Sequence, residues 1–265
     1  MAVPALALPS SLQPYRRFSI PIILLFVLLL VLSMPARVLL SFVDVTQFGL
    51  YAQGVSGPWY AASSTRVRLQ TPSAAIDLTN LEWRVMPLAL LRGRFMLALD
   101  AEFAQRPVEA AVGIGVSGRV FVQHLSAAVP MREFAPLMTQ LTFPIDGQIN
   151  LQDVSLELQQ GWPSELHGKV LLTDVTLMLP IQLLAVGDVL LGLGMQGNDI
   201  LLAIIENNGQ LGLGGQLTLA ADRRYGLLLN STPSEQLSPE LRRQMQTMLG
   251  NPENGQFSLR YDSVW

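Results

Sequence analysis

Few residues in this sequence have the types and the spacing that catalysis requires. The 265 residues include no cysteine, which excludes thiolate catalysis, disulfides, zinc ribbons and iron–sulfur clusters. The two histidines, His124 and His167, lie near Ser126 and Glu165, but neither pair has the pattern of a nucleophile elbow or of a metal-binding helix. A transition metal would have to bind almost entirely through carboxylates, so we expect no metal site and interpret both histidines as strand residues.

One glycine-rich segment has the letters of a nucleotide-binding loop. Residues 192–197 read Gly-Leu-Gly-Met-Gln-Gly, which is a weak dinucleotide fingerprint. No alternation of strands and helices surrounds this segment, as a βαβ unit would require, so a loop is the better interpretation. The acidic residues are scattered singly, as solvent-facing strand positions would be. The sequence therefore predicts no enzyme and no cofactor.

The composition points to a membrane instead. Half of the residues are hydrophobic and only 14% are charged, and the mean hydropathy is +0.36, which is unlike a disordered chain. Residues 18–36 contain no charge, and residues 22–32 are all Ile, Leu, Phe or Val. At about 1.5 Å per residue, a helix of this length reaches across the hydrocarbon layer of a bilayer. We expect a single transmembrane anchor over residues 18–40, with Ile22, Leu25, Val27, Leu29 and Leu32 among its apolar positions.

A cleaved secretory signal is the alternative for the same stretch. Signal peptides have apolar regions of about 7 to 15 residues and a small-residue cleavage site. Here the apolar stretch is longer, and Pro35 and Arg37 flank any cut. Arg16 and Arg17 precede the span, and the positive-inside rule keeps that end in the cytoplasm. Residues 1–17 are thus predicted to be cytoplasmic, and residues 41–265 are predicted to form an exported domain.

The exported part alternates apolar and polar residues in steps of two, as strands with one buried face do. Residues 149–158 follow this alternation, with Val154 out of phase. A pattern of glycine, a polar or basic residue and then an apolar-x-apolar triplet recurs, and we interpret each copy as a turn that opens a new strand. The seven copies begin at Gly93, Gly118, Gly147, Gly168, Gly209, Gly215 and Gly255.

These strand signals set the expected fold class. A sheet of eight or more twisted strands must curl, split or close. We therefore expect a mainly β protein, in which the N-terminal helix is followed by a large curved antiparallel sheet with a few short helices. Both a half-barrel and a sandwich-like arrangement fit this expectation. The exported part carries 20 acidic and 14 basic residues, a net charge of −6, which excludes a nucleic-acid partner by charge.

Three stretches interrupt the alternation. Residues 234–250 are the clearest helix, with Ser238 as N-cap and Gly250 after the last turn. We expect its stripe of Leu and Met to pack onto the sheet rather than to bind a partner. Residues 131–141 are a weaker helix, because Pro136 lies inside them. Residues 180–193 are strongly apolar, and we interpret them as a segment that caps or plugs the sheet.

Several motifs in chain order resemble one bacterial family. After the anchor come Val55-Ser56-Gly57-Pro58-Trp59, residues 81–93 from Leu-Glu-Trp-Arg to Leu-Arg-Gly, Gly118-Arg119-Val120 leading to Val129-Pro130, residues 141–147 (Leu-Thr-Phe-Pro-Ile-Asp-Gly), Asp199 leading to Gly215-Gln216-Leu217-Thr218-Leu219, and Leu249-Gly250 before Gly255-Gln256-Phe257. This order resembles protein N of the type II secretion system, also called general secretion pathway protein N. It covers nearly the whole chain. The sequence departs from the family at Trp59-Tyr60-Ala61, where a second glycine is usual.

The resemblance implies an inner-membrane accessory subunit of a Gram-negative export apparatus, with its bulk in the periplasm and no catalytic residues. The implied partners are other type II secretion components and the inner membrane. Residues of the matching motifs carry over as structural or interaction positions, and these are Gly57, Trp59, Trp83, Pro87, Gly93, Gly147 and Gly215.

Two functions remain open on the sequence. A structural subunit would dock its polar face or a sheet edge onto secretion partners by strand addition. A lipid-binding module, similar to the AsmA-like group of bridge-like proteins, would instead keep an apolar groove open on its concave side. Abundant Leu and Val at alternating positions are compatible with both.

Overall fold

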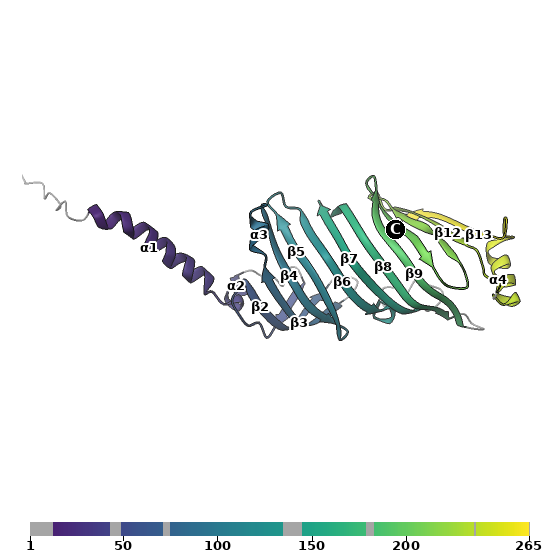
Figure 1. The fold of residues 1–265 in the computed structure, drawn as a ribbon, viewed down its shortest axis with the longest axis horizontal. Coiled ribbons are helices and arrows are strands. Elements are labelled where there is room, and N and C mark those ends of the chain that lie inside the picture. Colours follow the sequence, from purple (N-terminus) through teal and green to yellow (C-terminus); the bar gives the residue numbers. More distant parts are fainter. Residues whose placement is uncertain are drawn as a thin grey trace, which may run out of the picture.

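The computed structural model describes residues 13–42, 49–70, 75–134, 145–178, 183–235 and 237–264, and gives the backbone alone for residues 13–20, 134, 183, 244, 248 and 249. In this part of the chain, thirteen strands form one antiparallel sheet, accompanied by a few short helices (Figure 1). The expectation of a mainly β chain with a large antiparallel sheet is therefore confirmed.

The elements have the following bounds: α1 (Gln13–Leu32), α2 (Ala36–Phe42), β1 (Leu50–Gln53), β2 (Ala61–Gln70), β3 (Ala75–Val85), α3 (Pro87–Leu90), β4 (Arg94–Phe103), β5 (Arg106–Gly115), β6 (Val120–Pro130), the 3-10 helix η3 (Met131–Phe134), β7 (Ile145–Gln159), β8 (Trp162–Met178), β9 (Leu183–Gln196), β10 (Asp199–Asn207), β11 (Leu213–Leu219), β12 (Arg224–Ser231), α4 (Pro239–Leu249) and β13 (Phe257–Val264). Each strand pairs with the strands just before and just after it in the chain, so the sheet is an uninterrupted meander. It is a single open sheet rather than two packed sheets.

The N-terminal segment contains two helices. Helix α1 ends at Leu32. The backbone N–H of Met34 then donates to the Val31 carbonyl at 3.2 Å, three residues back, which makes a tighter final turn. Pro35 interrupts the helix because it has no N–H and because it disfavours helical geometry in the residue before it. Helix α2 then begins at Ala36. Residues 18–40 are thus not one continuous helix.

Helix α1 begins at Gln13, so Pro21 lies in its interior. Arg16 and Arg17 belong to α1, and their side chains lie outside the described part. Where side chains are described, no helix is both long enough and apolar enough to cross a membrane.

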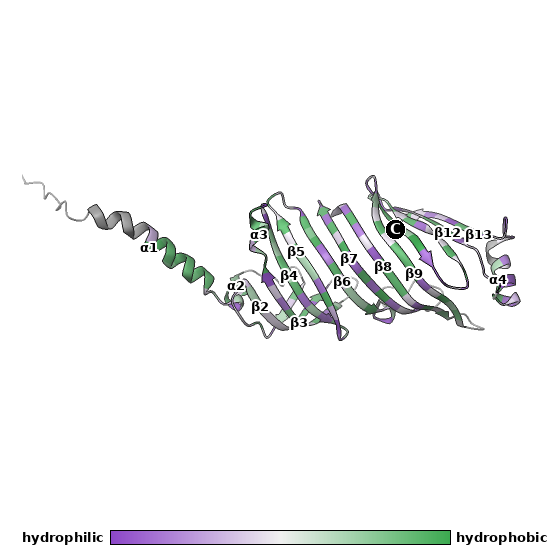
Figure 2. Cartoon of the chain, in the orientation of Figure 1, coloured by the Kyte–Doolittle hydropathy of each residue, from purple (hydrophilic) through white to green (hydrophobic). Residues whose placement is uncertain are grey.

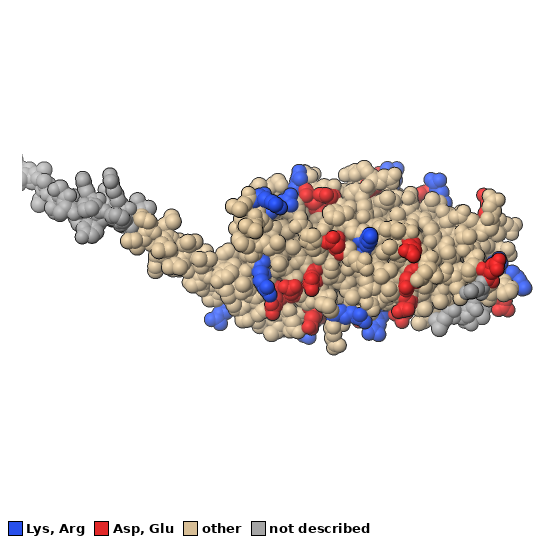
Figure 3. Space-filling view, viewed as in Figure 1, with Lys and Arg blue, Asp and Glu red and all other residues tan. Residues whose placement is uncertain are grey.

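The two faces of the sheet differ in chemistry. Register partners on one face are apolar, such as Leu99 with Ala110 and Leu151 with Val170. Register partners on the other face are polar, such as Arg68 with Asp77. We call these the inner face and the outer face. Figure 2 shows the resulting alternation of hydropathy along the strands, and Figure 3 shows charged side chains scattered over the face in view.

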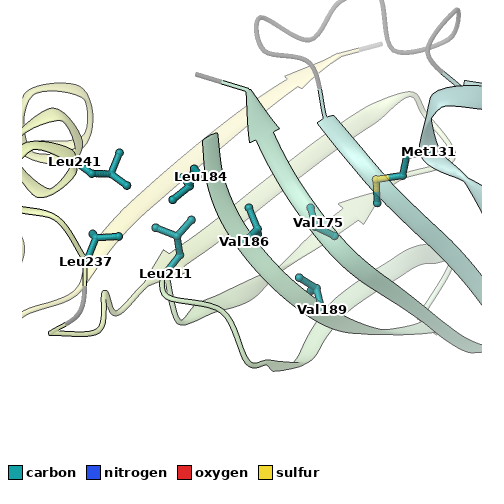
Figure 4. Packing of buried hydrophobic residues seen from close by; sticks show 8 residues of the cluster. All are labelled: Met131, Val175, Leu184, Val186, Val189, Leu211, Leu237 and Leu241. Carbon is teal, nitrogen blue, oxygen red and sulfur yellow. The ribbon is translucent and has the colours of Figure 1, made fainter. Parts of the chain in front are cut away.

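The sheet curls toward its inner face at the C-terminal end. In Figure 1, β12 and β13 pass behind β9. The main buried cluster lies inside this curl and joins η3, β8, β9, the turn before β11, and α4 with the loop before it (Figure 4). Its members are Met131, Val175, Leu184, Val186, Val189, Leu211, Leu237 and Leu241. The curl therefore has a packed interior at one end.

Helix α4 confirms the predicted helix. The Ser238 hydroxyl accepts the backbone N–H of Leu241 at 3.3 Å, and Gly250 follows the last residue with φ +85°. Leu241 is 5% exposed within the main cluster, and Met245 packs against that cluster. Core packing, rather than a free partner-binding stripe, explains the apolar side of this helix.

Two expectations about local structure are wrong, and a third is tested only in part. The apolar segment 180–193 does not cap the sheet, because Leu183–Gln196 is β9, a strand paired on both sides. The glycine-rich segment 192–197 mostly belongs to the same strand and only ends in a turn. The described part of the predicted helix 131–141 is the short η3, and residues 135–141 lie outside the described part.

The glycine pattern also has a different meaning at four of its seven copies. Gly93, Gly118 and Gly255 precede strands as expected, but Gly209 lies in a loop. The other three lie within strands, and their φ angles are +146° at Gly147, +146° at Gly168 and +136° at Gly215. An added Cβ would lie 2.9 Å from the Thr173 carbonyl oxygen at Gly147 and 2.7 Å from Val154 Cα at Gly168. These glycines therefore permit close backbone approach within the sheet.

A pair of neighbouring glycines tests this explanation. Gly215→Ala should destabilise the protein by about 1–3 kcal/mol, because the new Cβ collides with the Leu228 carbonyl and strains a positive φ. A Cβ added at Gly214 would have open space around it, so Gly214→Ala should change the free energy of unfolding by less than about 1 kcal/mol. Chemical unfolding followed by circular dichroism measures both. Equal stabilities of the two variants would refute the explanation.

Candidate functional site

β-Bulges interrupt four strands of the sheet, and we call them together the bulge row. Asn80 in β3, His124 in β6, Asp153 in β7 and Asp174 in β8 all have positive φ, between +51° and +54°. The pairing register shifts at each of these positions. Because a bulge bends its strand and increases the local twist, these bulges add to the curvature of the sheet. The bulge row thus connects the local backbone geometry with the curl of the sheet.

Side chains on neighbouring strands satisfy the backbone that the bulges free. The backbone N–H of His124 donates to the Ser155 hydroxyl at 3.2 Å, and that of Asp174 donates to Asp188 Oδ1 at 3.0 Å. The backbone N–H of Asp188 in turn donates to Asn208 Oδ1 at 2.7 Å. An unpaired backbone group is costly, so these short polar side chains are part of the curvature.

The two histidines are both strand residues. His124 lies in β6, where its Nδ1 is 2.6 Å from Asp153 Oδ1, and the two side chains are 76% and 71% exposed. This pair joins two bulges on the outer face. His167 lies in β8 and is the register partner of Ser155. Neither histidine lies in an enclosed site.

The inner face is only partly covered where α4 and η3 do not reach. Across β4 to β7 its side chains are mostly half-buried rather than buried, for example Leu99, Val112 and Leu156. Ile114 is 50% exposed and Val120 is 40% exposed. A sheet face under a second layer would have most of its central residues fully buried. Within the described residues, this half of the inner face is therefore an apolar surface without a second layer.

The two edges of the sheet differ in accessibility. At one edge, β1 has four residues, and the loop that follows it continues along β2, where Ser56 and Ser63 exchange backbone hydrogen bonds of 2.9 Å. At the other edge, β13 has eight residues and pairs only with β12 among the described strands. Leu259 and Tyr261 on its inner side are 38% and 52% exposed. Of the two edges of the sheet, the unpaired edge of β13 is thus the longer, and it is the one more available for pairing with a further strand.

Tryptophans join the N-terminal helix to the sheet. The indole N–H of Trp59 donates to the Val31 carbonyl of α1 at 2.8 Å, and the indole N–H of Trp83 donates to the Trp59 carbonyl at 3.1 Å. Gly57 has φ +96°, and an added Cβ there would lie 2.8 Å from the Ala61 carbonyl oxygen. Its own carbonyl accepts the N–H of Ala36 at 2.9 Å. Three of the predicted positions, Gly57, Trp59 and Trp83, therefore meet in one junction.

The remaining predicted positions are spread over the sheet. Pro87 is the first residue of α3, and Gly93 ends the turn after it with φ +67°. Gly147 and Gly215 lie inside β7 and β11, so the structure does not bring them together with the others. The predicted anchor positions lie in α1 with exposed side chains: Ile22 64%, Leu25 55%, Val27 51%, Leu29 56% and Leu32 42%.

Most of the titratable groups that lie close together are exposed ion pairs, and Glu157, which pairs with Arg119, is 14% exposed. Arg68 donates to both carboxylate oxygens of Asp77, at 2.7 and 2.9 Å, and these hydrogen bonds hold the pKa of Asp77 below its usual range. A hollow of about 690 Å³ on the outer face includes Arg224 and Arg260, and both arginines already pair with neighbouring aspartates. No three His, Asp or Glu side chains of the described residues converge as metal ligands would. The charged side chains of the outer face are thus arranged as on a surface that is exposed to solvent.

The bulge row is the feature that sequence reasoning missed. Val154 stands out of phase with its neighbours because the bulge at Asp153 shifts the alternation by one residue. A break in the period of two, next to Asp, Asn or His, was therefore the available signal. These residue types tolerate the left-handed backbone conformation better than most.

Comparison with known proteins adds the family. The model of the family described as type II secretion system (T2SS), protein N, matches residues 49–260. No match was found among curated proteins or among solved structures. The matched region runs from just before β1 into β13, so it includes β1 to β12 and the first half of β13. The chain belongs to the type II secretion system protein N family.

Proposed function

We propose that this protein is a non-enzymatic accessory subunit of the type II secretion apparatus that acts through protein contacts of its sheet. Family membership supports a part in type II secretion. The long edge of β13, which pairs only with β12 among the described strands, carries the proposal of protein contacts. The titratable pairs of the outer face are exposed and lie outside any enclosed cavity, which favours a binding role over a catalytic one.

We place the protein in the inner membrane, with α1 as a single anchor and the sheet in the periplasm. The uncharged stretch 18–36 supports this placement, as do the two arginines before it. Leu24, Phe26 and Leu28 are 69%, 63% and 50% exposed in α1. Such a continuous apolar surface is unfavourable in water and favourable in a lipid core.

The contact mode we propose is strand addition at β13. An added strand would pair with the free backbone groups of this edge. Arg260 and Asp262 lie on its outer side, and Leu259 and Tyr261 lie on its inner side. A partner strand with alternating polar and apolar residues would continue both faces of the sheet. The edge at β1 is shorter and less suited to this role.

A second candidate function is binding of a lipid on the inner face. The specific observation in its favour is the half-buried apolar surface across β4 to β7, where Ile114 and Val120 are 50% and 40% exposed. An acyl chain would bury such a surface. The packed cluster under α4 restricts this candidate to the N-terminal part of the sheet.

The anchor is tested by a charge in its middle. Leu28→Arg should lower the driving force for membrane insertion by about 3 kcal/mol, because arginine is unfavourable at the centre of a span. The matched control Leu28→Phe should insert normally. The measurement is the fraction of protein that resists alkaline extraction from membranes. If the unmodified protein is fully extracted, the anchor is refuted.

Strand addition is tested by photocrosslinking in secreting cells. A benzoylphenylalanine at Tyr261, on the β13 edge, should crosslink to a type II secretion component, since an added strand would lie within reach of this side chain. The control is the same substitution at Tyr51, which is 45% exposed on the opposite edge. Products that are identical at the two positions, or that contain no secretion component at Tyr261, would contradict the proposal.

Lipid binding is tested by mass spectrometry of protein released from mild detergent. A phospholipid should remain bound to the unmodified chain, and Ile114→Glu should reduce its occupancy, because the charge enters the apolar surface. Leu228→Glu, a control on the outer face where Leu228 is 40% exposed, should retain the lipid. A lipid-free unmodified chain would end this candidate.

A further inference from the structure

Two adjacent turns at one end of the sheet expose large apolar side chains. In and after α3, Leu88 is 76% exposed, Leu90 is 52% exposed and Leu91 is 85% exposed. In the turn between β5 and β6, Val116 is 94% exposed. Exposed apolar residues of this size are ordinary when single, but a contiguous group indicates an interaction surface.

These residues lie around one end of the sheet. The backbone N–H of Val116 donates to the Gly93 carbonyl at 3.0 Å, which joins the two turns. Ile114 pairs in register with Val120 on the inner face, whereas α3 packs through Ala89 against a small buried cluster on the outer face. The apolar side chains therefore border this end of the sheet on both faces. We call this border the apolar rim, and it consists of Leu88, Leu90, Leu91, Ile114, Val116 and Val120.

Basic residues outnumber acidic residues beside the apolar rim. Residues 83–99 contain Arg84, Arg92 and Arg94 and no acidic residue, although the whole chain has a net charge of −3. Arg94 lies over the ring of Phe121, with its guanidinium carbon 4.1 Å from the ring centre. Arg84 and Arg119 have carboxylate partners at 3.5 and 2.8 Å, whereas Arg92 has none among the described residues. An excess of positive charge thus borders the apolar side chains.

The apolar rim lies at the end of the sheet from which α1 departs. Trp59 accepts the indole N–H of Trp83 on its carbonyl and donates its own indole N–H to Val31. Val85, the last residue of β3, donates to the Tyr60 carbonyl at 2.7 Å, and α3 begins two residues later. Figure 1 shows α2 and α3 together at this end. Phe42, at the end of α2, is 76% exposed.

We propose that the apolar rim enters the headgroup region of an anionic bilayer, with Arg92 beside the lipid phosphates. This inference rests on the proposed anchor, because α1 would hold the rim close to the same membrane. Projecting turns with leucine and valine tips insert between lipids, and bordering arginines gain from a negative surface. A protein partner would be expected to offer acidic groups and a matching hollow, whereas the lipid surface needs only proximity. The rim would then fix the tilt of the sheet relative to the membrane.

The absence of cysteine from the chain makes a direct test possible. The full chain carries one cysteine, Leu91→Cys or Val116→Cys, labelled with an environment-sensitive fluorophore and reconstituted into phosphatidylcholine vesicles with or without phosphatidylglycerol. The control is Glu240→Cys in α4, at the opposite end of the sheet in Figure 1. Lipids with a quencher in the upper acyl chain should quench both rim positions several-fold more than the control. Arg92→Glu should reduce this quenching in the phosphatidylglycerol vesicles.

The outcomes separate the rim from the anchor. Flotation of the vesicles reports the anchor, and lipid quenching reports the rim. A chain that floats but shows no more quenching at Leu91→Cys and Val116→Cys than at the control would overturn the rim proposal and leave the anchor intact. A rim that is shielded from water without lipid quenching indicates a protein contact and also overturns it. If alkaline treatment strips the chain from the vesicles, the anchor is refuted, and lipid quenching at the rim positions before that treatment would still support the rim.

Discussion

The structure depends on backbone groups that leave the regular pairing of the sheet. A bulge frees an N–H that must find an acceptor, and at His124 and Asp174 the acceptor is a side chain on the next strand. Each bulge adds a local bend and twist to its strand. A flat sheet of thirteen strands would be unusual, and the bulge row adds to the curvature. Polar residues at a few bulged positions thus contribute to the form of the sheet.

This curvature divides the inner face into two parts. Toward the C-terminus, the sheet curls far enough for Leu211, Leu237 and Leu241 to meet β9, and the interior is packed. Toward the N-terminus, the same face has no described second layer and stays half-exposed. The contrast between the two parts lets one chain combine a stable core with a surface that is available for binding.

The sequence predicted an element correctly where a single physical signal determines that element. Alternation with a period of two predicted the strands, and the signals at Ser238 and Gly250 predicted α4. It was a poor guide where two rules compete. Residues 183–196 are apolar at most positions, so their periodicity could not separate a buried strand from a capping segment. Gly147, Gly168 and Gly215 looked like turns because glycine serves both turns and close strand contacts.

The candidate site was only partly predictable for a related reason. Trp59 and Trp83 stood out as large residues near strand ends, but their hydrogen bonds to Val31 and to each other depend on how α1 meets the sheet. The apolar rim gave no periodic signal, because it is made of turns. Its leucines were visible in the sequence, whereas their exposure required the fold.

The strictly consecutive strand order has a consequence for how the chain matures. Each strand needs only the one that precedes it, so a polypeptide emerging amino end first can add hairpins one at a time without waiting for distant segments. In such an assembly the sheet gains one hairpin after another. The number of strands can change by whole hairpins while the order of the other strands stays the same. Loss or gain of a two-strand unit would therefore shorten or lengthen the molecule while the remainder keeps its neighbours.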